Sequence, residues 1–420
     1  MTKKNVKDLW NEQTAVVSYP TEGITTKDRI KGALMGALIG DALGVGCHWY
    51  TEYESFWSDF SPWVDDYVDP VKEGADQKWP DIHAWRYKQG VRAGWNSQSG
   101  QLIQILLEVC AKNTQNSPDG IGAFDRTEYI TAIEDFFEYQ LLPTGTVDIN
   151  GDVSNFMGRF TDSAIKENFD VWYNRGAKDG VWWSEDQIAS QTNTTEAAQI
   201  GVILACLYRN PIELLPIAYK FSRIWYSDRA YIMAQTMYIM TVQAIINGVP
   251  LESLLGYFQV MNEQEMGAYY ANKYIDYDEM HTPINAVNML RKPHLFPFPD
   301  DRFVTLMFGG LDCHQKHLLP GAYYFATKYS DNFEKAVLTC VNGIGNNMAC
   351  AALTGGLAGA MTGINGIPKR FVDGLKNDEA LIPKRYQSQA AYLLDLAQMI
   401  ADGSNGEIPD FSFNAPVRVN

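Results

Sequence analysis

The feature of this sequence that most constrains its fold is a helix whose glycines recur four residues apart. The helix is predicted to begin at Thr26, which can cap it, and Gly32, Gly36 and Gly40 then lie along one face. Each glycine costs roughly 1 kcal/mol in a helix interior, so three of them need a packing reason. We therefore expect another helix to approach this face closely. A membrane dimerisation motif is excluded, because the apolar segment is short and runs into Asp41.

Helical spacing of apolar residues continues along the chain, and strand-like alternation is scarce. An amphipathic helix is predicted after Ser99, ending near residues 113–118. Further helices are predicted at residues 129–142, 195–208, 212–225, 231–247, 251–257, 320–329, 332–340, 348–363 and 386–401. No linker rich in Gly, Ser or Pro separates two halves. We predict one all-α domain over residues 26–402, with a polar N-terminal arm at 1–25 and a C-terminal tail at 403–420.

Two stretches interrupt the helical pattern. Residues 50–92 are aromatic, acidic and broken by Pro62, Pro70 and Pro80, and residues 273–304 are again irregular and rich in proline. Long irregular stretches are uncommon in compact domains and often have a function. The first stretch is open to two interpretations, a rim over a binding site or a surface insertion.

Composition excludes several classes of partner. The net charge of -16 and the pI near 4.8 disfavour binding to nucleic acid or to anionic membranes, since both need basic residues. The N-terminus lacks the apolar core of a signal peptide, and no run of about 18 apolar residues predicts a membrane span. Six cysteines without a CxxC pair favour free thiols in a reducing compartment. We expect a cytoplasmic protein, and the oligomeric state is not indicated.

Several motifs, in order, resemble those of the ADP-ribosylglycohydrolase superfamily. Residues 32–44 resemble its opening motif, and residues 45–50, with a His-Trp pair, are closer to its J1-crystallin and selenoprotein J branch. Residues 311–314, running on to Pro320, resemble the Cys-His segment of that branch, and residues 342–360 its late glycine-rich motif. The matched order spans roughly residues 26 to 375. The resemblance implies a single orthogonal all-α domain of this type, here with irregular insertions.

The resemblance also shows which chemistry is missing. Hydrolases of this superfamily bind two Mg²⁺ ions through a Thr-Asp-Asp segment and a later Gly-Gly-Asp-x-Asp segment. In this chain the early acids fall at Ser97 and Gln98, and the late acids fall at Asn346 and Met348. Hard cations need carboxylate oxygens, and a thioether does not hold Mg²⁺. We therefore predict no metal and no cofactor.

Neighbouring positions depart from the family in the same way. Ile344 and Ala349 stand where the hydrolases have a glycine and a threonine. The J1-like branch often reads Gly-Gly-Asp-Asn followed by Arg; Asn347 keeps that asparagine, whereas Cys350 replaces the arginine. The metal-binding motifs are thus degenerate as a set, while the other motifs that carry the resemblance are retained.

Two residues of the opening motif are candidates for acid–base chemistry. Asp41 is the one acid retained in the motif set, and it either acts on substrate or binds backbone N–H groups at a helix end. His48 titrates near neutral pH, so it is either a general acid or base or a packed, hydrogen-bonded histidine. Both alternatives stay open for both residues.

The other reactive side chains support weaker hypotheses. Cys313, His314 and His317 are spaced too tightly for a usual paired zinc cluster, and no second pair matches them. Cys313 as a nucleophile lacks an identifiable activating base. Asp162 either faces the site from a central helix or caps that helix.

Amide and hydroxyl side chains dominate the two degenerate motifs. Both motifs open helices, whose free N–H groups favour polar or anionic ligands, but Ser and Asn are also common caps. The predicted substrate-binding residues are Trp49, Trp95, Asn96, Ser97, Gln98, Ser99, Asp162, His314, Asn346 and Asn347.

Three functions are compatible with these residues. The first, which we favour, is a metal-independent enzyme acting on a small glycosidic or nucleotide-like molecule, with Asp41 and His48 as catalytic residues. The second is an inactive pseudoenzyme that binds a small polar ligand or a partner protein. The third is a structural, crystallin-like protein. Fold analogy does not choose among them.

Overall fold

The computed structural model describes residues 18–72, 87, 91–140, 162–174, 189–254, 256–258, 286, 290, 300–377 and 388–408. These residues form an all-α architecture, as predicted, with one short antiparallel ribbon of β1 (Lys376–Asn377) and β2 (Ser388–Gln389). Most of the irregular region 273–304 and part of the region 50–92 lie outside the described residues. No helix in the described part is long and apolar enough to cross a membrane.

The predicted helices are present, with bounds that differ by a few residues. The helices of the first half are α2 (Thr26–Val45), α3 (Tyr53–Phe60), α5 (Gln98–Asn116), α6 (Arg126–Gln140), α7 (Ser163–Asn174), α8 (Glu196–Leu207), α9 (Pro211–Trp225) and α10 (Arg229–Ile246). The second half contains η2 (Leu251–Ser253), α15 (Asp301–Met307), α16 (Gln315–Lys328), α17 (Phe333–Val341), α18 (Asn347–Thr362), η3 (Ile364–Gly366), α19 (Lys369–Gly374) and α20 (Ala390–Gly403).

Three predicted helix starts need correction. The helix predicted from residue 386 begins at Ala390, because Ser388 and Gln389 form strand β2. Thr25, not Thr26, caps α2, and it forms a reciprocal capping box with Asp28. Helix α16 begins at Gln315 and contains Pro320, where the helix was predicted to start. Proline is favoured in the first helical turn, which made Pro320 a misleading start signal.

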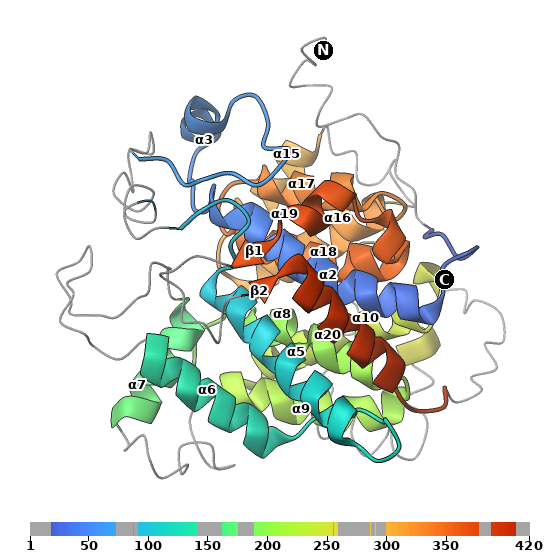
Figure 1. Cartoon of the computed structure of the whole chain (residues 1–420). Coiled ribbons are helices and arrows are strands. Elements are labelled where there is room, and N and C mark those ends of the chain that lie inside the picture. The colour runs from blue at the N-terminus through green and yellow to red at the C-terminus, as the bar shows by residue number, and fades with distance from the viewer. Residues whose placement is uncertain are drawn as a thin grey trace.

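The glycine face of α2 packs directly on α18, in the middle of the molecule (Figure 1). A Cβ atom at Gly32, Gly36 or Gly40 would lie 2.1, 2.2 or 2.0 Å from the carbonyl oxygen of Gly359, Gly355 or Ala351. These distances leave no room for a side chain, so the expected close approach of a second helix is confirmed. Helix α18 contributes glycines of its own to the contact.

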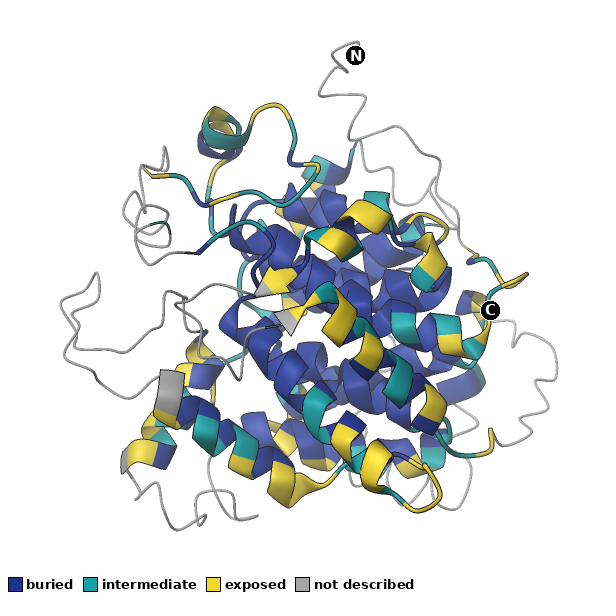
Figure 2. Ribbon diagram, viewed as in Figure 1, coloured by how far each residue is buried: buried dark blue, intermediate teal, exposed yellow. Residues whose placement is uncertain are grey.

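The α2–α18 pair forms the buried centre around which the other helices pack (Figure 2). Helices α16 and α17 cover α18, whereas α5, α8 and α20 pack on α2. Helices α8, α9 and α10 contact one another as a further group. Helix α2 is buried on nearly all sides, and its last part lies against the starts of α5 and α18.

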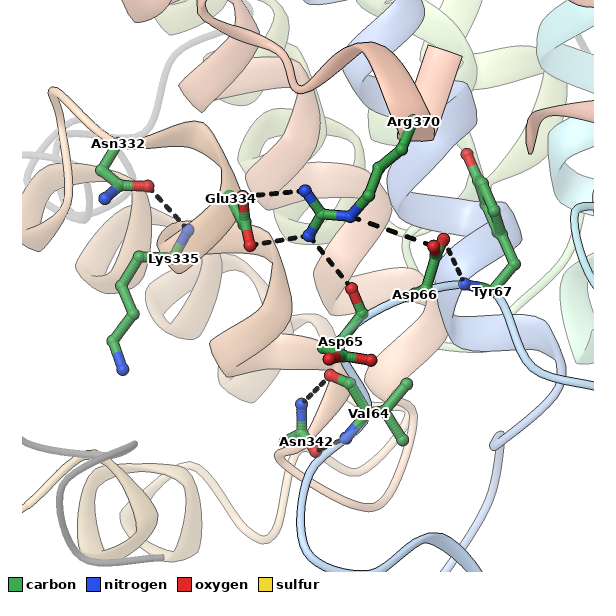
Figure 3. Close-up of polar contacts among 9 residues, drawn as sticks. All are labelled: Val64, Asp65, Asp66, Tyr67, Asn332, Glu334, Lys335, Asn342 and Arg370. Atoms are coloured by element: carbon green, nitrogen blue, oxygen red, sulfur yellow. Dashed lines mark hydrogen bonds and ion pairs between the residues drawn. The ribbon is translucent and has the colours of Figure 1, made fainter. Parts of the chain in front are cut away.

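The described beginning of the 50–92 region is attached to the segment that precedes α18 (Figure 3). The buried Asn342 side chain accepts a hydrogen bond from the Val64 N–H and donates one to the Val64 carbonyl, both at 2.9 Å. Arg370 pairs with Glu334 at 2.7 Å and donates to the carbonyl oxygen of Asp65 at 3.2 Å. These contacts order the residues around Val64 against the late motif.

Candidate functional site

The start of α5 is held by the buried carboxylate of Asp41. Asp41 lies in the last part of α2 and has no exposed surface. Its Oδ2 accepts hydrogen bonds from Asn96 Nδ2 at 2.9 Å and from the Ser97 N–H at 2.8 Å, and its Oδ1 accepts one from Ser97 Oγ at 2.5 Å. A Cβ at Gly100 would lie 2.2 Å from Asp41 Oδ2, so glycine is needed there for this contact. Asp41 therefore positions the first turn of α5.

The first turn of α5 also reaches the segment that opens α7. Ser97 is the N-cap of α5, and its Oγ accepts a hydrogen bond from the Gly100 N–H at 3.1 Å. Ser99 Oγ donates to Asp162 Oδ2 at 2.9 Å. Asp162 is 6% exposed, and its carbonyl accepts the first helical hydrogen bond of α7, from the Lys166 N–H. The start of α5 and the start of α7 are thus joined side chain to side chain.

The start of α18 is fixed by the two asparagines of the late motif. Asn346 is its N-cap and accepts a hydrogen bond from the Ala349 N–H at 3.3 Å. Asn347 donates to the Val341 carbonyl at 2.7 Å, and its Oδ1 lies 3.2 Å from His48 Nδ1. Both asparagines are buried. Their side chains therefore hold the turn between α17 and α18.

The predicted histidine and aromatic site residues lie in packed surroundings. His48 is 1% exposed and contacts Trp49 edge to face, with ring centroids 5.5 Å apart. Trp95 belongs to the hydrophobic core at 1% exposure. Trp49 is partly buried, and its backbone has a φ of 74°. Of these three, Trp49 alone keeps part of its surface exposed.

Cys313 interacts with side chains from the starts of several helices. It precedes α16 and is partly exposed. Burial and the negative charges of Asp162 and Glu196 raise the pKa of its thiol. A hydrogen bond with Asn346 acts in the opposite direction on this pKa. The groups that act on the Cys313 thiol thus come from the starts of α7, α8 and α18, and together with Cys313 they are the centre of the candidate site; Ser99 connects α5 to it through Asp162.

Glu196 is an acid at this centre that the sequence interpretation missed. It is the first residue of α8 and is 1% exposed. Its Oε2 accepts hydrogen bonds from Thr194 Oγ1, at 2.5 Å, and from the Tyr226 hydroxyl. Burial raises the pKa of Glu196, and the two hydrogen bonds offset only part of this effect. The one signal in the sequence was an acid at the start of an otherwise apolar helix.

A partly exposed rim borders these buried groups. Asn193 Nδ2 lies 2.6 Å from His314 Nε2, and the Gln315 N–H donates to the Asn193 carbonyl at 2.6 Å. Asp312 Oδ1 lies 2.8 Å from His317 Nδ1, and both side chains are partly exposed. The predicted residue His314 thus belongs to the rim, next to the loop that precedes α8.

The side chains at the positions where the resemblance places metal ligands do not fit Mg²⁺. Ser97 and Asn346 are used as helix caps, and Met348 packs against Gly44 of α2. Among the described residues, no group of three or more His, Cys, Asp or Glu side chains is arranged to hold a metal ion. Neutral amide and hydroxyl groups bind hard cations poorly. We therefore derive no chemistry through a metal.

Glu196→Gln should stabilise the protein increasingly as the pH rises. Because the folded-state pKa is above the unfolded value near 4.5, the protonation of Glu196 contributes stability that is present below pH 4.5 and is lost as the pH rises through the folded pKa. Glutamine stays neutral throughout and can still accept hydrogen bonds from Thr194 and Tyr226. The free energy of unfolding, measured in urea from pH 4.5 to 8.5, should show a gain that grows with pH. Glu213→Gln, on the exposed start of α9, is the control, and a gain independent of pH would contradict the prediction.

Comparison with known proteins agrees with this architecture. The sequence model of the ADP-ribosylglycohydrolase family matches residues 22–405. A solved structure described as an "ADP-ribosylglycohydrolase-related protein complex" superposes with a TM-score of 0.54 at 16% sequence identity, covering 90% of this chain and 99% of that one. At this identity, the structural likeness shows the fold alone. No curated protein matches the sequence. Since the family match covers most of the chain, this protein belongs to the ADP-ribosylglycohydrolase family.

Proposed function

We propose that the protein is a metal-independent, hydrolase-type enzyme that acts on a small glycosidic or nucleotide-like molecule. The observation that carries this proposal is that two buried acids, Asp162 and Glu196, each lie within electrostatic range of the thiol of the partly exposed Cys313. Glycosidic bonds can be hydrolysed by a pair of carboxyl groups without a metal, provided that one is protonated and the other ionised. The different surroundings of Glu196 and Asp162 support a protonated carboxyl group at one of them and an ionised carboxylate at the other.

Glu196 is the proton donor in this proposal. Burial raises its pKa, which favours a protonated carboxyl group that can give its proton to the leaving group. Asp162, held by Ser99, accepts a proton from the attacking water. Water adds to the sugar carbon as the glycosidic bond breaks, so one proton is given and one is taken in each turnover.

Asp41 and His48 receive a positioning role in place of the catalytic role expected from the sequence. Both carboxylate oxygens of Asp41 accept hydrogen bonds from Asn96 or Ser97, so they are committed to the start of α5. His48 is buried beside Asn347. Each residue supports a helix start at the site.

Helix dipoles favour binding of a polar or anionic substrate group at the same place. Cys313 lies just before α16, and three groups that act on its thiol, Asp162, Glu196 and Asn346, stand at the starts of α7, α8 and α18. A helix N-terminus carries partial positive charge and free N–H groups. Substrate would enter beside the rim at Asn193 and His314, which are partly exposed. This arrangement supplies the polarity that the missing metal ions supply in the hydrolases.

The finer family placement is also part of the proposal. The His48-Trp49 pair and Asn347 support the J1-crystallin branch, and the residues at positions 97, 98, 346 and 348 support a degenerate metal site. We accordingly expect no micromolar binding of Mg²⁺ and negligible hydrolysis of ADP-ribosyl-arginine.

The test is a panel of small N- and O-ribosides, incubated with the protein in EDTA and followed by NMR for cleavage of the glycosidic bond. At least one compound should be cleaved, and Glu196→Gln or Asp162→Asn should slow cleavage by about 100-fold or more. Asp402→Asn, which changes a surface ion pair with Lys27, is the control and should retain activity. Activity that requires Mg²⁺, or that survives both substitutions, would refute the proposal.

A second candidate is a ligand-binding protein without turnover. It is favoured by the capping role of Ser97 and Asn346, whose polar groups serve the fold. In the same panel, a compound that raises the melting temperature without being cleaved would identify this function.

A further inference from the structure

Two glutamines in the first turn of α5 are exceptional in this fold. Gln98 and Gln101 are 0% and 1% exposed. Among the described residues, neither the oxygen nor the nitrogen of either side chain has a hydrogen-bond partner. Gln98 directly follows the N-cap Ser97, and Gln101 lies one turn further along the same face.

Other buried glutamines show how the fold normally treats this side chain. Gln235 accepts a hydrogen bond from the Ala198 N–H at 2.9 Å and donates to the Thr194 carbonyl at 3.1 Å. Gln243 donates to two backbone carbonyls and accepts from the Tyr257 hydroxyl. Gln104, one turn beyond Gln101 on α5, donates to Glu108 at 2.8 Å. Gln199 is an intermediate case, because its Nε2 donates to Thr195 Oγ1 while its Oε1 has no partner among the described residues. Gln98 and Gln101 differ in that both side-chain polar atoms are unpaired there.

The two unpaired amides lower the stability of the fold unless a ligand forms hydrogen bonds with them. A buried polar group without a partner costs about 1–3 kcal/mol, and each amide contributes both a donor and an acceptor. An apolar side chain of similar size would avoid this cost. The position next to Ser99, which holds the proposed base Asp162, connects the two amides to the catalytic centre.

We propose that Gln98, assisted by Gln101, recognises a substrate group that presents a hydrogen-bond donor beside an acceptor. Two groups of this kind occur in ribosides, a primary carboxamide and the amino edge of a nucleobase such as adenine, and these are the ones that we propose. A glutamine amide matches such an edge with two hydrogen bonds at once. Because the glutamines are neutral, they select for this geometry and against a charged edge. The inference rests on the proposed function, and it names the substrate class for the same site.

The experiment compares two matched pairs of probes by isothermal titration calorimetry on the full chain. Adenosine is paired with purine riboside, which lacks the amino group, and nicotinamide riboside is paired with nicotinic acid riboside, which has a carboxylate in place of the amide. Wild-type protein should bind one member, adenosine or nicotinamide riboside, at least about tenfold more tightly than its partner. The pair that shows the difference identifies the recognised group, either the amino edge of a nucleobase or a carboxamide.

Substitutions on α5 connect this selectivity to the glutamines. Gln98→Leu should remove the preference while leaving the unliganded protein at least as stable as wild type, because an unpaired buried amide is removed. Gln104→Leu, on the same helix, is the matched control and should keep the preference. The retained stability of Gln98→Leu separates loss of recognition from loss of folding.

Three results would overturn the inference: equal affinity within both pairs, no binding of any probe, or an unchanged preference in Gln98→Leu. Equal affinity within both pairs and an unchanged preference in Gln98→Leu can each be distinguished from failure of the proposed hydrolase function. Cleavage of a riboside without discrimination between paired probes would leave the hydrolase proposal standing alone. Selective binding that depends on Gln98 but leads to no cleavage would support the recognition site and refute the hydrolase.

Discussion

Gly36→Ala should destabilise the protein by about 3 kcal/mol or more, because it overfills the contact between α2 and α18. The new Cβ would lie 2.2 Å from the Gly355 carbonyl oxygen and 3.0 Å from Cε2 of Phe333. The nearest atom is backbone within a helix, so it cannot rotate away as a flexible side chain could. Relief requires the two helices to separate, and α2 is buried by α5, α8 and α20 as well. Urea denaturation followed by far-UV circular dichroism measures the change in the free energy of unfolding.

The control for this experiment is Gly256→Ala. Nothing lies within 4 Å of a Cβ atom at Gly256, so the substitution adds a methyl group without a clash. Its effect should stay within about 1 kcal/mol. If Gly36→Ala unfolds at the same urea concentration as wild type, the close approach of α2 and α18 is wrong.

This contact illustrates how far the fold could be predicted from sequence. The spacing of Gly32, Gly36 and Gly40 predicts a closely packed face, and the structure confirms it. Periodicity identifies a face but not its partner, because any helix with small residues could approach it. The partner, α18, brings Gly355 and Gly359 to the same contact, and this pairing is a property of the tertiary fold.

The missed helices have a physical explanation too. Helices α3, α15 and α19 contain 8, 7 and 6 residues, too few for a clear 3.6-residue period. Helix α7 is longer, but its sequence mixes charged and aromatic residues. Such elements depend on packing more than on local preference. Boundaries such as that of α16 shifted because Pro320 is tolerated inside the helix.

The candidate site was only partly predictable for a related reason. Ser97 and Asn346 fit both a cap and a ligand contact from sequence, and the structure places both as caps. The sequence could not show that Gln98 lacks a partner, because pairing depends on neighbouring helices. Glu196 was missed because its burial, which raises its pKa, is a property of the tertiary fold, and its partner Tyr226 lies 30 residues further along the chain. The type of a residue alone therefore indicates its role less well than its hydrogen-bond partners in the fold do.

Asp41→Ala should lower the free energy of unfolding by about 3 kcal/mol, because it leaves buried donors without their acceptor. The N–H and hydroxyl of Ser97 and the amide of Asn96 all donate to this carboxylate, and both residues are at most 5% exposed. Hydrogen exchange at the Gly100 and Gln101 amides should accelerate, since Ser97 would no longer be held at the start of α5.

Asp69→Ala is the matched control for Asp41→Ala, because Asp69 also accepts a hydrogen bond from a backbone N–H, that of Ala93 at 2.8 Å, but lies exposed. Water can replace an exposed acceptor, so the loss there should stay below about 1 kcal/mol. The comparison also separates the two roles considered for Asp41. A positioning residue loses stability and exchange protection together, whereas a catalytic residue would lose activity with stability unchanged. Finding that second pattern would return Asp41 to the acid–base chemistry expected from its place in the opening motif.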